Sequence, residues 1–310
     1  MRNFEQPHIE DNENSTDRKE SSKLSRRDFL KMTALFCAAI AVAPKELLTQ
    51  QPKSPELSDD AEVKKISDFI AKHKEVVDYA KLWENETPVL FIGERHTLKS
   101  DKDEIIGSLP MLKKLGMTHL AMEMLSEKQQ PIVDNYLAGK ITIEKVLEIF
   151  KDRWDKGPGI PEKYMALLDA AKSHGMRILA IDLYTATDEY VTGEFFRKRN
   201  ANWARIAASV LKDKKAKILF YCGQSHSGYN KVDDSANEIL EKMGIRSKVI
   251  AFAGGEVAPE DAYFFVDKVA KAAQGLKVGG EKFGLRVKSD DDVRSMDYVI
   301  HLPQVEKSDK

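Results

Sequence analysis

The sequence predicts an α/β fold with a mainly parallel sheet flanked by helices. Short apolar segments recur along the chain, and most of them are apolar on both faces of a strand. Stretches with apolar residues at helical spacing separate these segments. Strands buried on both faces and alternating with helices are typical of a parallel sheet covered on both sides. A chain of 310 residues is long enough for one large domain with a buried core.

Five strands are expected first, and the apolar segments that predict them span 88–92, 118–124, 176–183, 216–222 and 248–253. Two further strands are expected late in the chain, at 262–266 and 298–302. Helical periodicity predicts helices at 60–84, 103–115, 127–138, 143–154, 161–174, 188–211 and 233–243. Pro110 is expected to bend or split the second helix, because proline lacks an amide hydrogen. The three consecutive helices between the second and third strands form an insertion that we expect to cap one end of the sheet.

The N-terminal segment carries the pattern of an export signal. Residues 25–31 read S-R-R-D-F-L-K, which fits the twin-arginine motif at every fixed position, and an apolar stretch follows at 32–43. That stretch is too short to span a bilayer. Such a segment is an address read by a receptor and is excluded from fold reasoning. The alternative, a buried helix preceded by chance arginines, does not explain the order and position of these residues.

We therefore predict a twin-arginine signal peptide at 1–43, a linker rich in Pro, Ser, Gln and Asp at 44–60, and an α/β domain at 61–310. The Tat export machinery would deliver this domain to the periplasm or cell envelope. Cys37 lies in the predicted signal, so Cys222 is left without a partner for a disulfide. The net charge of −1 gives no reason to expect overall attraction to nucleic acid or anionic lipid, and no apolar run is long enough for a stable membrane span.

Polar residues follow the predicted strands repeatedly. Glu94 and His96 follow the first strand, Glu123 ends the second, and Asp182 ends the third. His226 follows the fourth strand between two glycines, and Gly-Gly-Glu follows the fifth. Ligands of open parallel sheets bind beyond the carboxyl ends of the strands, so we expect these side chains to share one site.

Two histidines and a carboxylate suit a divalent transition metal, so His96, Glu123 and His226 are candidate metal ligands. The same groups with Glu94 are able to position and deprotonate a water for hydrolysis. A plainer role is open for each of them, as part of a polar loop, a turn or a solvated strand tip. Arg199, on a predicted helix, reaches either the site or solvent.

Tyrosines near this edge are able to bind a metal or haem iron through oxygen, or else serve as packing residues. They are Tyr164, Tyr184, Tyr221 and Tyr229. The sequence contains no phosphate-binding loop, no G-x-S-x-G elbow and no C-x-x-C pair.

Several of these segments resemble the ChaN-like haem-binding family. They are F-I-G-E-R-H at 91–96, A-M-E-M at 121–124, residues 130–140, Y-M-A-L-L-D-A-A-K at 164–172, the strand at 177–182 and G-Q-S-H at 223–226. The family belongs to a superfamily with the Tiki proteases and the erythromycin esterase-like hydrolases. The resemblance implies an α/β domain that binds haem in iron acquisition, whereas the other branches imply hydrolysis. Glu94, His96, Glu123 and His226 fall on superfamily motif positions.

The leading hypothesis is an exported haem- or metal-binding protein that takes part in iron uptake, with His96, His226 and Tyr229 as cofactor-binding candidates. The alternative is a metal-dependent peptidase or esterase with Glu94, His96, Glu123 and His226 as catalytic residues. A third is a partner-binding domain without chemistry. Haem requires a broad apolar slot, which we expect under the helices of 127–174 near Phe150 and Trp154. A hydrolase requires a compact polar pocket that brings Glu123 close to both histidines.

Overall fold

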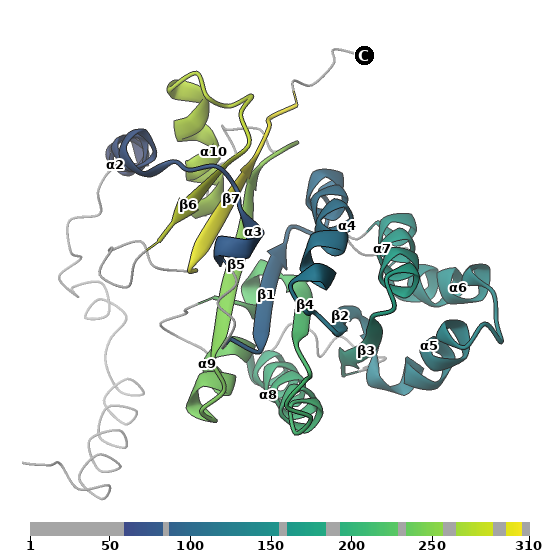
Figure 1. The fold of residues 1–310 in the computed structure, drawn as a ribbon. Coiled ribbons are helices and arrows are strands. Elements are labelled where there is room, and N and C mark those ends of the chain that lie inside the picture. The colour runs from purple at the N-terminus through teal and green to yellow at the C-terminus, as the bar shows by residue number, and fades with distance from the viewer. Residues whose placement is uncertain are drawn as a thin grey trace, which may run out of the picture. The chain divides into compact units, whose positions relative to one another are not determined.

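The computed structural model describes residues 59–82, 87–154, 160–183, 193–228, 234–256, 265–287 and 296–305 (Figure 1). All of them belong to one compact unit, residues 57–310. The predicted signal peptide and all but two residues of the predicted linker lie outside the described residues. None of the described helices has the length and apolar character that crossing a membrane requires.

The core is a seven-stranded sheet with the order β3-β2-β4-β1-β5-β7-β6. All neighbouring pairs are parallel except β6 and β7, which are antiparallel. The strands are β1 (Val89–Glu94), β2 (His119–Ser126), β3 (Arg177–Asp182), β4 (Ile218–Gly223), β5 (Ser247–Gly254), β6 (Phe283–Arg286) and β7 (Tyr298–Leu302). The predicted fold class is confirmed.

Helices cover both faces of this sheet. One face packs against α3 (Tyr79–Leu82), α4 (Lys99–Lys114), α5 (Gln130–Leu137), α6 (Ile143–Trp154) and α7 (Pro161–Ser173). The other packs against α2 (Asp59–His73), α8 (Gly193–Val210), α9 (Ala236–Lys242) and α10 (Phe265–Gly275). Neighbouring strand residues contribute to opposite cores: Leu90 and Ile92 to the first, Val89 and Phe91 to the second. This alternation is what a strand buried on both faces requires.

Several details of the structure differ from the sequence-based expectations. The predicted helix at 60–84 ends at His73, because Glu75 then forms a backbone bridge with Gly284 at the edge of the sheet. The strand predicted at 262–266 is contradicted where the structure describes it, since α10 begins at Phe265. Pro110 does not split α4, which runs through it as one helix of 16 residues. The short strand β6 was not expected.

Cys222 lies at the centre of the sheet. Its strand β4 pairs with β1 on one side and β2 on the other, and Cys222 stands opposite Gly93. The side chain is fully buried, and burial raises the pKa of its thiol well above the ordinary value. Cys222 is therefore an unreactive core residue.

Candidate functional site

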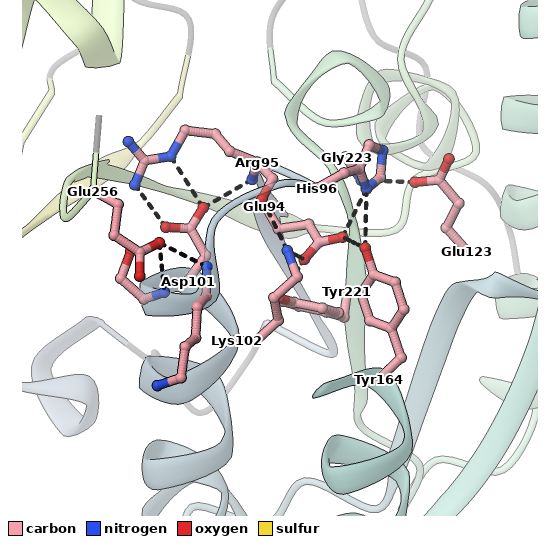
Figure 2. A network of polar contacts seen from close by, with 12 residues as sticks. Glu94, Arg95, His96, Asp101, Lys102, Glu123, Tyr164, Tyr221, Gly223 and Glu256 are labelled. Atoms are coloured by element: carbon pink, nitrogen blue, oxygen red, sulfur yellow. Dashed lines mark hydrogen bonds and ion pairs between the residues drawn. The ribbon is translucent and has the colours of Figure 1, made fainter. Parts of the chain in front are cut away.

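The predicted site residues do converge at the carboxyl edge of the sheet. Glu94 ends β1, Glu123 lies in β2, Asp182 ends β3, and His226 closes the short 3-10 helix η4 (Gln224–His226) after β4. Their side chains form two polar networks, one centred on Glu94 and one centred on Arg199. Figure 2 shows the first network beside Glu123.

The Glu94 carboxylate is fully buried and has four side-chain partners. Its Oε1 atom lies 2.7 Å from Nδ1 of His96 and accepts a hydrogen bond of 2.7 Å from Tyr164. Its Oε2 atom lies 2.5 Å from the Tyr221 hydroxyl and 2.6 Å from Nζ of Lys102. Burial alone would raise the pKa of Glu94, but the His96 hydrogen bond and the Lys102 charge outweigh it and lower that pKa. Glu94 is thus held as a carboxylate in the protein interior.

His96 extends from this anchor to the protein surface. Its side chain is 23% exposed, whereas that of Glu94 is 0% exposed. Its Nε2 atom would lie only 2.8 Å from a Cβ atom at position 223, so a glycine is needed there. Burial alone would lower the pKa of His96, but the Glu94 hydrogen bond and the charges of Glu123 and Glu94 raise it. A buried carboxylate thus orients an imidazole that is only partly exposed.

The loop that carries His96 is fixed from its other side. The Arg95 guanidinium turns away from His96 and contacts the buried Asp101 at 2.6 Å, and it donates to the Gly254 carbonyl at 2.9 Å. Nζ of Lys102 also donates to the Arg95 carbonyl at 2.9 Å. The side chain of Glu256, labelled in Figure 2, accepts a hydrogen bond of 2.8 Å from the Lys99 amide, the first amide of α4. His96 therefore stands on a rigid support.

Arg199 of α8 is the centre of the second network. Its guanidinium lies 2.6 Å from Glu123 and 2.6 Å from Asp182, and both carboxylates are almost fully buried. It also donates to Nε2 of His226 at 2.9 Å. The second oxygen of Glu123 accepts from the Gly223 amide at 2.7 Å. Burial alone would raise the pKa of Glu123, but the surrounding positive charge and this amide lower it.

His226 is fully engaged and neutral. Arg199 has only donors, so Nε2 accepts, and Nδ1 donates to the Asn200 side-chain oxygen at 2.7 Å. The ring stacks on Phe196 at 4.1 Å and contacts Trp203 at 4.6 Å between ring centroids. Burial, aided by the Arg199 charge, lowers the pKa of His226 to about 3. His226 therefore supports the Arg199 network.

This geometry bears on the metal and hydrolase hypotheses. No group of three or more His, Cys, Asp or Glu side chains in the described part of the chain is arranged to hold a metal ion. The Arg199 guanidinium occupies the space between Glu123, Asp182 and His226, where a cation would otherwise balance the carboxylates. To act as a base, His226 would need the lone pair of Nε2, and that lone pair already accepts a hydrogen bond from Arg199.

The structure describes only some of the candidate tyrosines and of the residues expected near a haem slot. Tyr164 and Tyr221 donate to Glu94, and burial together with the Glu94 charge raises the pKa of both, so neither supplies a tyrosinate ligand. Phe150 is a fully buried core residue whose ring lies 6.0 Å from that of Tyr164. Tyr184, Tyr229 and the Trp154 side chain lie outside what the structure describes.

Sequence reasoning did not assign a role to Lys102, Asn200 or Trp203. All three lie on helices and are buried against the site. One feature of the sequence could have identified Lys102: it lies in the first turn of the helix that follows the Gly93-to-His96 motif. A lysine in the first turn of a helix on a buried face requires a carboxylate partner.

The chain was also compared with known proteins. Residues 82–194 match the family model described as "Haem-binding uptake, Tiki superfamily, ChaN". This segment includes Glu94, His96, Glu123 and Asp182 but ends before Arg199 and His226. Among curated proteins, none matches the chain significantly.

Three solved structures illustrate the structural relatives. A succinoglycan biosynthesis protein has a TM-score of 0.51 and 13% identity, with 78% of this chain and 97% of that chain covered. The type III effector HopBA1 has a TM-score of 0.49 and 18% identity, covering 81% of this chain and 95% of that chain. ChaN of Campylobacter jejuni, described with cofacial haem binding, has a TM-score of 0.45 and 15% identity, covering 75% and 94%. Likeness at these identities concerns the fold alone. The family model over residues 82–194 confirms the resemblance to the ChaN-like haem-binding family of the Tiki superfamily.

Proposed function

We propose that this chain is an exported haem-binding protein and that His96 is its ligand for the haem iron. The observation that carries the proposal is the partly exposed His96 imidazole, which the buried Glu94 carboxylate orients. A carboxylate behind a ligating histidine fixes its tautomer and raises its basicity. The match of residues 82–194 to a haem-binding family supports the same reading.

The donor set fits haem better than a bare divalent metal. Because the porphyrin of haem already binds the iron, this chain would need to supply few further ligands. His96 alone meets that requirement, and Glu94, Tyr164 and Lys102 hold it in place. A divalent metal without a macrocycle would need several ligands, and Arg199 already neutralises Glu123 and Asp182. The hydrolase alternative is less well supported, because two of its candidate residues, Glu123 and His226, are already engaged by Arg199.

A haem titration followed by visible absorption tests this assignment. Wild-type protein is expected to give a saturable, shifted Soret band. His96→Ala is expected to lose this band or to bind at least tenfold more weakly, and added imidazole should restore part of the spectrum. Glu94→Gln should weaken binding by about 10- to 100-fold, as loss of such a supporting partner typically does.

His73→Ala is the matched control, since His73 is an exposed histidine on α2. It should bind haem like the wild type. Identical spectra for wild type and His96→Ala would remove His96 from the site. If folded wild-type protein takes up no haem, the proposed haem-binding function is wrong.

We also propose export through the Tat machinery to the periplasm or cell envelope, with iron acquisition as the use of the bound haem. The S-R-R-D-F-L-K motif at residues 25–31 supports export, and the match of residues 82–194 to a family described by haem-binding uptake supports this use of the haem. The full chain with Arg26→Lys and Arg27→Lys together should stay in the cytoplasmic fraction, whereas Arg18→Lys should be exported normally. Fractionation and immunoblotting provide the measurement, and export of the double variant would contradict the proposal.

A further inference from the structure

The two edges of the sheet differ in how their charges are balanced: at the carboxyl edge, Arg95, Lys102 and Arg199 pair with buried carboxylates. The carboxyl ends of β1, β2 and β3 carry Glu94, Glu123 and Asp182. The segments that lead into β2, β3, β4 and β5 carry cationic residues instead. Because these strands are parallel, their entry segments meet at one edge of the sheet, opposite the site.

We call this cluster the basic edge. It consists of Lys114, Arg177, Lys212, Lys214, Lys215 and Arg246, and all six are exposed. Backbone hydrogen bonds hold the entry segments side by side: the amide of His119 donates to Lys217 at 3.0 Å, and that of Arg177 donates to Thr118 at 2.9 Å. The positive charges therefore gather on one face of the molecule.

Few acidic groups offset them. Among the described residues of these entry segments, Asp213 lies between the lysines, and Glu241 lies nearby at the end of α9. The net charge of −1 for the whole chain averages over this face and does not describe it.

The basic edge also has a hollow and exposed apolar side chains. A hollow of about 440 Å³ lies between the end of α8 and the entries to β1, β4 and β5, and Lys212, Lys214 and Arg246 line it. Met111 and Met243, near the same edge, are 46% and 51% exposed. Cations beside exposed apolar side chains suit the interface of a lipid bilayer, where phosphates lie above acyl chains.

We propose that the basic edge docks the protein on the surface of a bilayer that contains anionic phospholipid. A nucleic acid is a poorer fit, because no Phe, Tyr or Trp is found among the exposed large apolar residues that the structure describes, so bases have nothing to stack on. Strands of six residues, such as β1, separate the two edges by roughly 20 Å. Docking by the basic edge leaves His96 and its network facing away from the bilayer, open to a ligand or a partner.

Vesicle co-sedimentation tests this proposal with two triple variants of equal net charge. The first, Lys212→Gln, Lys214→Gln and Lys215→Gln, removes three cations from the basic edge. The matched control, Lys64→Gln, Lys72→Gln and Lys140→Gln, removes three exposed cations elsewhere. The processed protein recovered from cells is mixed with phosphatidylcholine vesicles that contain or lack phosphatidylglycerol.

Wild type and control should bind the phosphatidylglycerol vesicles, should bind pure phosphatidylcholine much more weakly, and should be released by salt. The first triple variant should bind with a partition coefficient lower by on the order of a hundredfold, given the usual contribution of each lysine near an anionic surface. Thermal unfolding confirms that all variants are folded. Equal binding by both variants, no binding by wild type, or binding to nucleic acid but not to vesicles would each overturn the proposal.

Discussion

A neutral histidine held by an arginine shows how individual residues set the chemistry of this site. His226 accepts from Arg199 and donates to Asn200, and two aromatic rings enclose it. Protonation would place a positive charge beside the guanidinium. The folded state therefore resists protonation of His226, whereas the unfolded chain accepts a proton near the ordinary histidine pKa of about 6.5.

This difference predicts a pH dependence of stability. The pKa of His226 is about 3 in the folded state, so its contribution is complete above pH ~6.5 and is lost as the pH falls from there. Between pH ~6.5 and ~5 the loss should be about 2 kcal/mol, at 1.36 kcal/mol per pH unit. His226→Gln, which keeps an acceptor for Arg199, should lack this loss in urea unfolding at the two pH values.

His96 has the opposite effect on the pH dependence of stability. Its raised pKa stabilises the folded state at low pH, and this contribution is lost as the pH rises through that pKa. The comparison of wild type with His226→Gln isolates the His226 part. His73→Gln, on the exposed face of α2, should show the wild-type slope. If the free energy of unfolding of His226→Gln depends on pH as that of the wild type does, His226 is not held neutral.

The sequence predicted the residues at strand ends better than those on helices. Glu94, His96, Glu123 and His226 were expected to meet because parallel strands share one carboxyl edge. The sequence did not decide whether Arg199 reaches the site or solvent. Helical periodicity alone does not determine the direction of a long side chain at the border of a helix face. Its partners Glu123 and Asp182 decide this, and that requires knowing the fold.

At the scale of elements, two glycines show how backbone conformation governs stability. Gly107 lies exposed inside α4, and Gly175 follows α7 with a φ of +63°. A Cβ atom at either position would meet nothing within 4 Å. The effects of replacing these two glycines by alanine should therefore differ only because their backbone conformations differ.

Gly107→Ala should raise the free energy of unfolding by about 0.5–1 kcal/mol, because glycine inside a helix carries that cost. Gly175→Ala should lower it by about 1–2 kcal/mol, because a left-handed conformation strains alanine. Urea denaturation midpoints at constant m-value provide the measurement. A shift of the same sign in both variants would show that local packing, and not backbone conformation, decides the outcome.

Elements with strong local patterns were predicted well. The helix at 143–154 matches α6 in both ends, and each of the five early strands agrees within two residues. The chain after His73 did not follow its helical periodicity, because pairing of Glu75 with Gly284 depends on a strand more than 200 residues away. Long-range pairing of this kind leaves no local trace in sequence.

At the scale of the whole molecule, the two edges of the sheet have different characters. Carboxylates end the strands and cations precede them, so one sheet separates the proposed haem site from the proposed membrane surface. The sequence contained both patterns. Only the parallel topology reveals that each pattern belongs to a single edge, which is why the net charge gave no hint of the basic edge.

Cys222 gives the molecule a built-in probe of its own opening. The thiol lies in the middle of the central strands and is fully buried, and its raised pKa keeps it protonated and unreactive. A labelling reagent can reach it only when β4 parts from its neighbours. In a chain with Cys37→Ser, the labelling rate of this one native thiol would report how often the centre of the sheet opens, and a bound ligand that stabilises the sheet would slow that rate.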